Sequence, residues 1–144
     1  MIIPDANLLL YAYSERSPSQ PAARAWLEMA FSSGEAVGLP WSVIQAFLRI
    51  GTNSRAMTAP LTMDEAVATV SEWLALDQVA PVLPGERHWT ILSGLLDTAQ
   101  CRGPLVADAH LAALAIEHGA QFYTADRGFA RFPGLRWTDP LRPA

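Results

Sequence analysis

The sequence has no lysine, a single cysteine and no long apolar run, and each shortage excludes something. All ten basic residues are arginine, and fourteen acidic residues leave a formal net charge of −4 and an isoelectric point near 5.2. This balance argues against tight nonspecific binding of nucleic acid, which depends on neutralising phosphates, but it leaves room for a local basic patch. Arginine suits bidentate phosphate contacts, although a GC-rich genome also favours arginine over lysine.

The cysteine count and the apolar pattern limit the compartment. Cys101 has no second cysteine to pair with, which fits a reducing environment. No apolar stretch approaches the roughly 18 residues of a membrane-spanning helix. The first residues, Met1–Asp5, have no basic segment of the kind that opens a signal peptide. We therefore expect a cytoplasmic protein without a membrane segment.

Length and composition predict one folded domain over residues 1–144. Hydrophobic residues make up 51% of the chain and charged residues 17%, so the chain can bury a substantial core. Short apolar runs predict strands at 2–4, 36–39, 79–83, 121–124 and 135–138. Helical patterns cover 8–13, 21–31, 41–50, 63–76, 88–100 and 105–118, and 126–131 predicts a turn or short helix.

The signals at helix ends support these boundaries. Thr62 and Glu65 have the spacing of a capping box, Pro104 precedes the 105–118 segment as a first helical residue, and Gly119 follows it as a terminator. Apolar strands that alternate with helices are typical of a parallel sheet covered on both faces. The predicted fold class is α/β, a three-layer α/β/α sandwich with a short parallel sheet.

Three aspartates are the candidate functional residues. Asp5 follows the first predicted strand and Asp126 follows the fourth, so both fall at the carboxyl edge of the sheet, where parallel sheets place their sites. Asp108 lies in the 105–118 helix. Three carboxylates that converge repel each other unless a cation lies between them, and such oxygen ligands favour Mg²⁺ or Mn²⁺. A metal held this way can clamp a phosphodiester and activate a water.

Each aspartate also has a structural interpretation. Asp5 and Asp126 are both placed to cap the segments that follow them. Asp108 is the most informative, because its helix is almost entirely apolar until Glu117 and a buried carboxylate is costly unless it is paired. The sequence offers no lysine to pair it and no arginine within one helical turn.

Other chemistries have no support in the sequence. Cys101 is isolated, and His88, His110 and His118 lack zinc-type spacing, so we interpret the histidines as structural or surface residues. There is no glycine-rich phosphate loop and no Gly-x-Ser-x-Gly elbow. Five tryptophans are interpreted as core or interface residues: Trp26, Trp41, Trp73, Trp89 and Trp137.

Taken together, these residues resemble the PIN domain and, within it, the VapC-like toxins of bacterial toxin–antitoxin systems. The matching features are spread over nearly the whole chain. They are the apolar strand into Asp5-Ala6-Asn7, the helix Trp41–Ile50, the run Asp108–Ala113, the segment Thr124-Ala125-Asp126-Arg127, and a tail, Phe129–Trp137, like that of an actinobacterial-type branch.

The resemblance implies a helix-covered parallel sheet and Mg²⁺- or Mn²⁺-dependent cleavage of RNA. It assigns metal binding and catalysis to Asp5, Asp108 and Asp126, and it places Asn7 and Thr124 where they would orient these acids. Many members carry a glutamate on the helix after the second strand, whereas this chain has Gln45 near that position. Because that charge is missing, the sequence does not decide whether a second metal ion binds. It also does not decide whether another acid, such as Asp97 or Glu117, compensates for the missing charge.

Substrate and partner residues can also be named. Arg49, Arg55, Arg102 and Arg127 are candidates for contact with RNA phosphates, with solvent exposure or ion pairing as the alternative for each. The resemblance implies a VapB-like antitoxin and a homodimer. An antitoxin segment that bears arginine would match the charge of an acidic site.

Three functions therefore compete. The first is a metal-dependent ribonuclease toxin. The second is a PIN-fold module that binds RNA or a partner without cutting, which Gln45 and the net negative charge favour modestly. The third is a housekeeping nuclease of RNA maturation. A short upstream reading frame that encodes a DNA-binding antitoxin would separate the first from the third.

Overall fold

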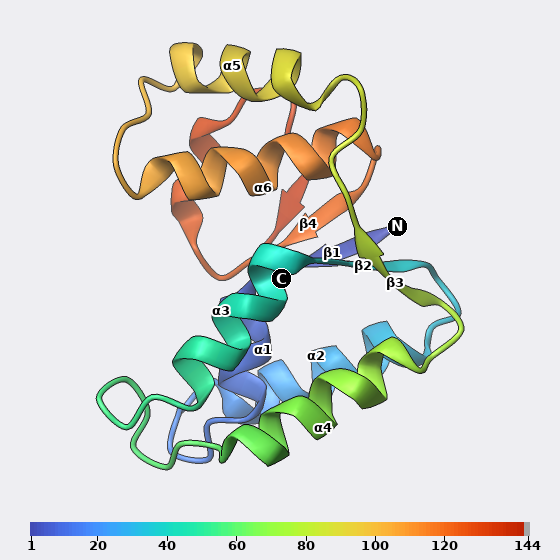
Figure 1. The fold of residues 1–144 in the computed structure, drawn as a ribbon, viewed down its shortest axis with the longest axis vertical. Helices are drawn as coiled ribbons and strands as arrows, with labels where there is room; N and C mark the ends of the chain where they lie inside the picture. Colours follow the sequence, from blue (N-terminus) through green and yellow to red (C-terminus); the bar gives the residue numbers. More distant parts are fainter. Residues whose placement is uncertain (143–144) are drawn as a thin grey trace.

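The computed structural model describes residues 1–142 and contains a five-stranded sheet whose strands are all parallel (Figure 1). The strand order is β3-β2-β1-β4-β5. The strands are β1 (Ile2–Pro4), β2 (Val37–Pro40), β3 (Val79–Val82), β4 (Gln121–Tyr123) and β5 (Trp137–Thr138). All five lie within the predicted segments or one residue beyond them, and the last begins two residues later than predicted.

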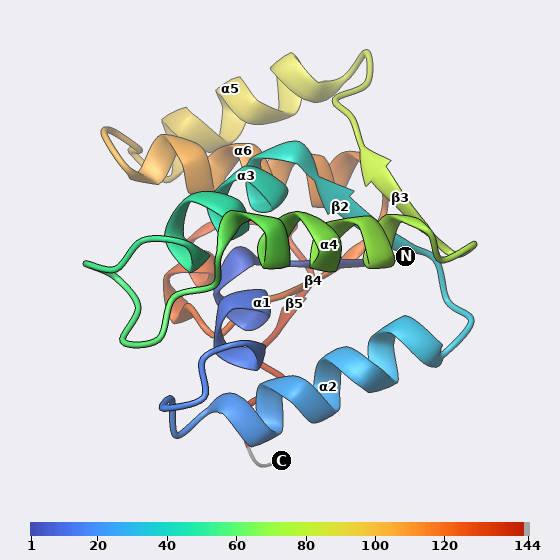
Figure 2. The same cartoon turned by 60° about the horizontal axis from the view of Figure 1, so that its bottom comes forward.

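The helices cover both sides of this sheet, which confirms the predicted α/β class. Figures 1 and 2 show α5 and α6 together on one side, while α1, α2 and α4 lie on the other. The helices are α1 (Ala6–Ala12), α2 (Gln20–Ser32), α3 (Trp41–Gly51), α4 (Met63–Leu74), α5 (His88–Thr98), α6 (Leu105–Glu117) and the short 3₁₀ helix η1 (Arg127–Arg131).

The residues predicted to begin and end α4 and α6 do so, except that Pro104 lies one position earlier relative to α6 than predicted. At the start of α4, the Glu65 amide donates to Thr62 Oγ1 at 3.1 Å and the Thr62 amide donates to Glu65 Oε1 at 3.0 Å, which completes the capping box. Gly119 follows α6 with a φ of 62°, a conformation that glycine adopts without strain. Pro104 caps α6 rather than occupying its first helical position, because the first helical residue is Leu105.

The core explains why the strands are apolar along their whole length. Ile3, Leu39 and Phe122 on the three central strands are fully buried, as expected for a sheet covered on both faces. The tryptophans divide between the two predicted roles. Trp26 and Trp73 are buried in the core, whereas Trp41 and Trp89 are exposed. No helix within residues 1–142 has the length and apolar character needed to cross a membrane.

The order of the strands determines where a site can form. From the central strand β1 the chain builds β2 and β3 on one side, and then returns to place β4 on the other side. Pro4 pairs with Tyr123, and the Asp5 amide donates to the Tyr123 carbonyl at 2.8 Å. The carboxyl ends of β1 and β4 therefore meet where the strand order reverses, which is the preferred ligand position in open parallel sheets.

Close packing of β2 against β3 gives a test of the core. A methyl group at Gly38 would overlap the Val82 side chain and lie 3.1 Å from Met1 Sδ. Overpacking a tight core costs about 1–3 kcal/mol, so we expect Gly38→Ala to lower the free energy of unfolding in urea by at least that amount.

Gly94 on the exposed face of α5 provides the matched control. A methyl group there has nothing within 4 Å, so Gly94→Ala should raise stability by about 0.5–1 kcal/mol. Equal effects of the two substitutions would contradict the close packing of β2 and β3.

Candidate active site

Asp5 lies directly after β1, where it caps α1 and is oriented by Thr124 and Asn7. Its Oδ1 accepts from the Ala6 amide at 2.8 Å and so caps α1. Its Oδ2 accepts from the Thr124 hydroxyl at 2.7 Å and from Asn7 Nδ2 at 3.3 Å. A carboxylate offers about four acceptor positions, so the capping interaction and the Thr124 and Asn7 bonds leave room for one more ligand.

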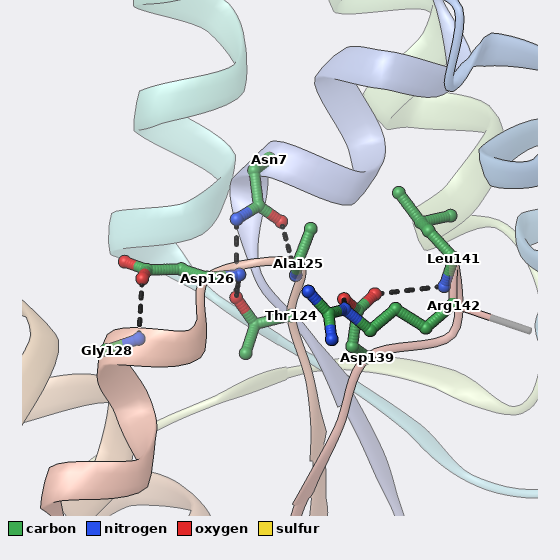
Figure 3. A network of polar contacts seen from close by, with 8 residues as sticks. All are labelled: Asn7, Thr124, Ala125, Asp126, Gly128, Asp139, Leu141 and Arg142. Atoms are coloured by element: carbon green, nitrogen blue, oxygen red, sulfur yellow. Dashed lines mark hydrogen bonds and ion pairs between the residues drawn. The ribbon is translucent and has the colours of Figure 1, made fainter. Parts of the chain in front are cut away.

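Thr124 joins the strand ends that carry the acids. It is fully buried, and besides donating to Asp5 it accepts from Asn7 Nδ2 at 3.3 Å and from the Asp126 amide at 3.0 Å. Figure 3 shows Asn7 reaching across from α1 to Thr124 and Ala125, whose amide donates to Asn7 Oδ1 at 3.5 Å. The one hydroxyl therefore uses its donor and both acceptor positions to fix the orientation of Asp5.

Asp126 also has a capping role, which was its structural interpretation from the sequence. Its Oδ1 accepts from the Gly128 amide at 2.8 Å and caps η1, as Figure 3 shows. The side chain is exposed, in contrast to Asp5. Capping uses only Oδ1 and leaves Oδ2 available, so a capping role for Asp126 is compatible with the predicted metal-binding role.

Asp108 and Asp5 line the same cleft, which has a volume of about 590 Å³. Asp108 lies in the first turn of α6 and is half-buried, because that turn faces the cleft while the later turns enter the core. The expectation that most of this helix is buried therefore fails at its first turn. On the opposite wall, α3 contributes Ser42, Ala46 and Arg49, which are spaced to lie on one helical face.

Charge repulsion connects the three acids. The pKa of Asp5 is raised from 3.8 to about 6. Burial is the main cause, and the charges of Asp108 and Asp126 act in the same direction, whereas the hydrogen bonds from Thr124 and Ala6 oppose the rise. Burial also raises the pKa of Asp108, as does the charge of Asp126, while Arg131 lowers it. Both aspartates are therefore less easily ionised than in an unfolded chain.

The carboxylate oxygens of these aspartates are suitable ligands for a divalent cation, although the side chains are not clustered around a single point. Within residues 1–142, no three histidine, cysteine, aspartate or glutamate side chains already form a cluster able to hold a metal ion. The charges of Asp108 and Asp126 nevertheless raise the pKa of Asp5, the charge of Asp126 raises that of Asp108, and a bound cation would relieve this repulsion. The oxygen donor set matches Mg²⁺ or Mn²⁺.

The remaining predicted residues lie at different distances from the cleft. Among the four arginines, Arg49 lines it. Arg55 lies in the exposed loop after α3, Arg102 between α5 and α6, and Arg127 at the start of η1, so their phosphate contacts stay predictions. Gln45 is exposed and lies on α3 beside the cleft-lining face rather than in the lining.

Neither suggested compensating acid lies at the cleft. Asp97 is exposed near the far end of α5. Glu117 accepts from the amides of Gly85 at 2.7 Å and Arg87 at 2.9 Å, and it lies nine residues beyond Asp108, about 14 Å along the helix axis.

The structure adds residues that sequence reasoning missed or discounted. Arg131 on η1 donates to the Gly128 carbonyl at 2.8 Å and acts electrostatically on Asp108. His110 lines the cleft, and its ring contacts His88. Burial, and then the neighbouring His88, lower the pKa of His110. Its place two residues after Asp108 was visible in the sequence, but its contact with another helix was not.

The raised pKa of Asp5 predicts how stability depends on pH. Between about pH 4 and 6 the folded protein holds a proton on Asp5 that the unfolded chain releases, so stability falls as pH rises through this window. Asp5→Asn removes the ionisation, but its Nδ2 cannot accept from Thr124 and Asn7 as Asp5 Oδ2 does. We therefore expect the unfolding free energy of this variant, relative to the metal-free wild type, to rise by about 2 kcal/mol between pH 4 and pH 7.5.

Thermal melts at several pH values check this expectation. The stability of Asp5→Asn relative to the wild type should fall as the pH is lowered from 7.5 to 4, and saturating Mn²⁺ should raise the melting temperature of the wild type alone. A gap that is independent of pH would contradict the assignment.

Comparison with known proteins identifies the family of this chain. The PIN domain family model matches residues 2–135. Ribonuclease VapC33 of Mycobacterium tuberculosis is 43% identical over 99% of both chains. Ribonuclease VapC43 of the same organism is 40% identical over 98% of this chain and 96% of its own length.

Solved structures agree on the fold. VapBC-1 from nontypeable Haemophilus influenzae matches 99% of this chain and 100% of the compared chain, with a TM-score of 0.70 and 14% identity. VapC20 of M. tuberculosis is described as a toxin that cleaves the sarcin–ricin loop. Its structure matches 94% of this chain and 99% of its own, with a TM-score of 0.63 and 18% identity. On the family match and the full-length relatives, this chain belongs to the PIN-domain family, among the VapC ribonucleases.

Proposed function

We propose that this protein is a Mg²⁺- or Mn²⁺-dependent endoribonuclease that cleaves RNA phosphodiesters and acts as the toxin of a toxin–antitoxin pair. The observation that carries the proposal is that Asp5 and Asp108 line one cleft at the carboxyl edge of the sheet and that the charge of Asp126 acts on both of them. Relatives at 40–43% identity over nearly the full length are ribonucleases, which supports the reaction class.

In this proposal the aspartates share the binding of the metal. Asp5 and Asp108 hold it directly, since both line the cleft, and Asp126 completes the site from the exposed side. A Mg²⁺ or Mn²⁺ ion held there would supply Lewis-acid stabilisation of the scissile phosphate and a water molecule of lowered pKa. Thr124 and Asn7 keep Asp5 in one orientation, so little reorganisation is needed when substrate enters.

Arg49 and Arg131 divide the positive charge around these acids. Arg49 lines the cleft from α3, opposite the acids, and is exposed, so its guanidinium is free to bind a phosphate of the RNA. Arg131 acts on Asp108 and favours its ionised form. The acidic protein thus places cationic side chains beside its carboxylates, where the RNA backbone must approach.

Partners follow from the same charge pattern. Several solved relatives are VapBC complexes, including one from Salmonella typhimurium bound to DNA. We extend this pairing to a VapB-like antitoxin whose arginine-bearing segment enters the cleft beside Asp5 and Asp108. We also extend the family resemblance to a homodimer, for which the exposed apolar side chains of Trp41 and Trp89 are available.

Substitution of Asp108 tests the proposed reaction. We expect purified, antitoxin-free protein to cleave tRNA or ribosomal RNA in Mg²⁺ or Mn²⁺ and to stop in chelator. Asp108→Asn should lower the rate at least a hundredfold, because it removes a charged metal ligand. Asp97→Asn makes the same chemical change at an exposed position outside the cleft and should retain the wild-type rate.

The outcomes separate the competing functions. RNA binding without metal-dependent cleavage, in both the wild type and Asp97→Asn, would favour a noncatalytic binding module. Cleavage that survives in Asp108→Asn would show that the metal site is misplaced or that the preparation contains another nuclease.

A further inference from the structure

Two histidines from neighbouring helices meet at the wall of the cleft. α5 and α6 lie side by side in Figures 1 and 2, and His88 opens α5 while His110 lies one turn into α6. His88 Nε2 is 3.0 Å from His110 Nδ1, and the rings meet edge to face with centroids 4.8 Å apart. His88 is buried, whereas His110 is half-buried and lines the cleft together with Asp108.

When both rings are neutral, the bond between them holds one hydrogen, and two arrangements exist. Either His88 Nε2–H donates to His110 Nδ1, or His110 Nδ1–H donates to His88 Nε2. His88 Nδ1 is buried, and it has no hydrogen-bond partner among the described residues. The second arrangement would put a hydrogen on this atom and bury an N–H group without an acceptor, which folded proteins strongly avoid.

The first arrangement also suits the cleft. It places a hydrogen on His110 Nε2, and within residues 1–142 no side chain or carbonyl accepts a hydrogen bond from that atom. Nε2 is not a buried unsatisfied atom, so it is accessible from the cleft that His110 lines. His110 shares the cleft lining with Asp5 and Asp108, and the negative potential of two carboxylates favours an N–H group in the cleft over a lone pair.

The lining of the cleft then matches a phosphodiester. Arg49 and Ser42 offer donors from α3, His110 offers an N–H from α6, and Asp5 and Asp108 lie with them in the same lining. A phosphate in RNA has two nonbridging oxygens. A cation held by Asp5 and Asp108 would attract one of these oxygens, and a neutral N–H donor would suit the other without placing a second positive charge beside the cation.

We propose that His110 is a substrate-binding residue whose Nε2–H donates to a nonbridging phosphate oxygen of the RNA, and that His88 is the positioning residue that fixes His110 in this tautomer. The proposal rests on the ribonuclease function given above and adds to it a recognition residue outside the three acids. It also revises the interpretation of both histidines as merely structural.

The tautomer can be measured directly, without activity. Long-range ¹H–¹⁵N spectra of the metal-free protein at pH 8 should show His110 protonated at Nε2 and unprotonated at Nδ1. His88→Gln carries an amide N–H in place of His88 Nε2–H and should keep this pattern, whereas His88→Ala should give a mixture of both tautomers. His110 protonated at Nδ1 in the wild type overturns the proposal.

The role in RNA binding is tested by His110→Ala and His110→Gln. Loss of one hydrogen bond to substrate should raise KM for RNA roughly tenfold in His110→Ala, and the amide of Gln should recover part of it. Mn²⁺ affinity, measured by calorimetry, should stay unchanged in both. His118→Ala is the control, since His118 lies at the opposite end of α6 and contacts the Leu83 carbonyl at 2.9 Å.

Each remaining result decides the matter. An unchanged KM in His110→Ala, or a loss of Mn²⁺ affinity, overturns the proposal. If the wild type cleaves no RNA, the ribonuclease function fails first, and binding of a ten-nucleotide RNA in Ca²⁺ replaces KM. His110→Ala must then weaken that binding while His118→Ala does not; equal affinities reject the role of His110.

Discussion

The buried hydroxyl of Thr124 makes three hydrogen bonds, and the geometry of the site depends on them. Thr124 directly follows β4 and donates to Asp5, which directly follows β1. Its hydroxyl oxygen accepts from Asn7 on α1 and from the amide of Asp126, which precedes η1. The ends of two adjacent strands and the beginnings of two helical segments are thereby fixed at one point. Remove this group, and Asp5 keeps its cap on α1 but loses its orientation relative to Asp126.

The same region shows how stability is exchanged for chemistry. The fold brings together carboxylates whose charges oppose each other, and the unfolded chain ionises Asp5 more easily than the folded protein does. Asparagine at this position would remove the charge and keep a cap for α1, but its Nδ2 could not accept from Thr124 and Asn7. The proposed cation would offset the cost of keeping the aspartate.

The sequence was sufficient to predict the fold class and the edge of the sheet where the acids lie. Strands that are mainly apolar predict burial on both faces, and Asp5 and Asp126 lie just beyond the ends of β1 and β4, which prove to be neighbours. Asp108 stood out because a carboxylate interrupts an apolar helix. Each of these inferences needs only local pattern and the rule that parallel strands end at one edge.

What the sequence could not supply depends on the packing of distant elements. Arg131 is 23 positions from Asp108, and His88 is 22 positions from His110, so no helical period relates them. Gln45 lies outside the cleft lining, although its α3 neighbours Ser42, Ala46 and Arg49 belong to it. Which face of a helix meets a cleft is determined by side-chain packing, which a single sequence does not specify.

The central position of β1 has a consequence for the order of events during synthesis. Asp5 and Thr124 are bonded across 119 positions of sequence, and the other neighbour of β1 in the sheet is β2. A chain emerging from the ribosome can therefore pair β1 with β2 early, but it has no assembled acidic site until β4 has emerged. The proposed ribonuclease site would therefore be absent for most of translation and would assemble only when β4 joins the sheet.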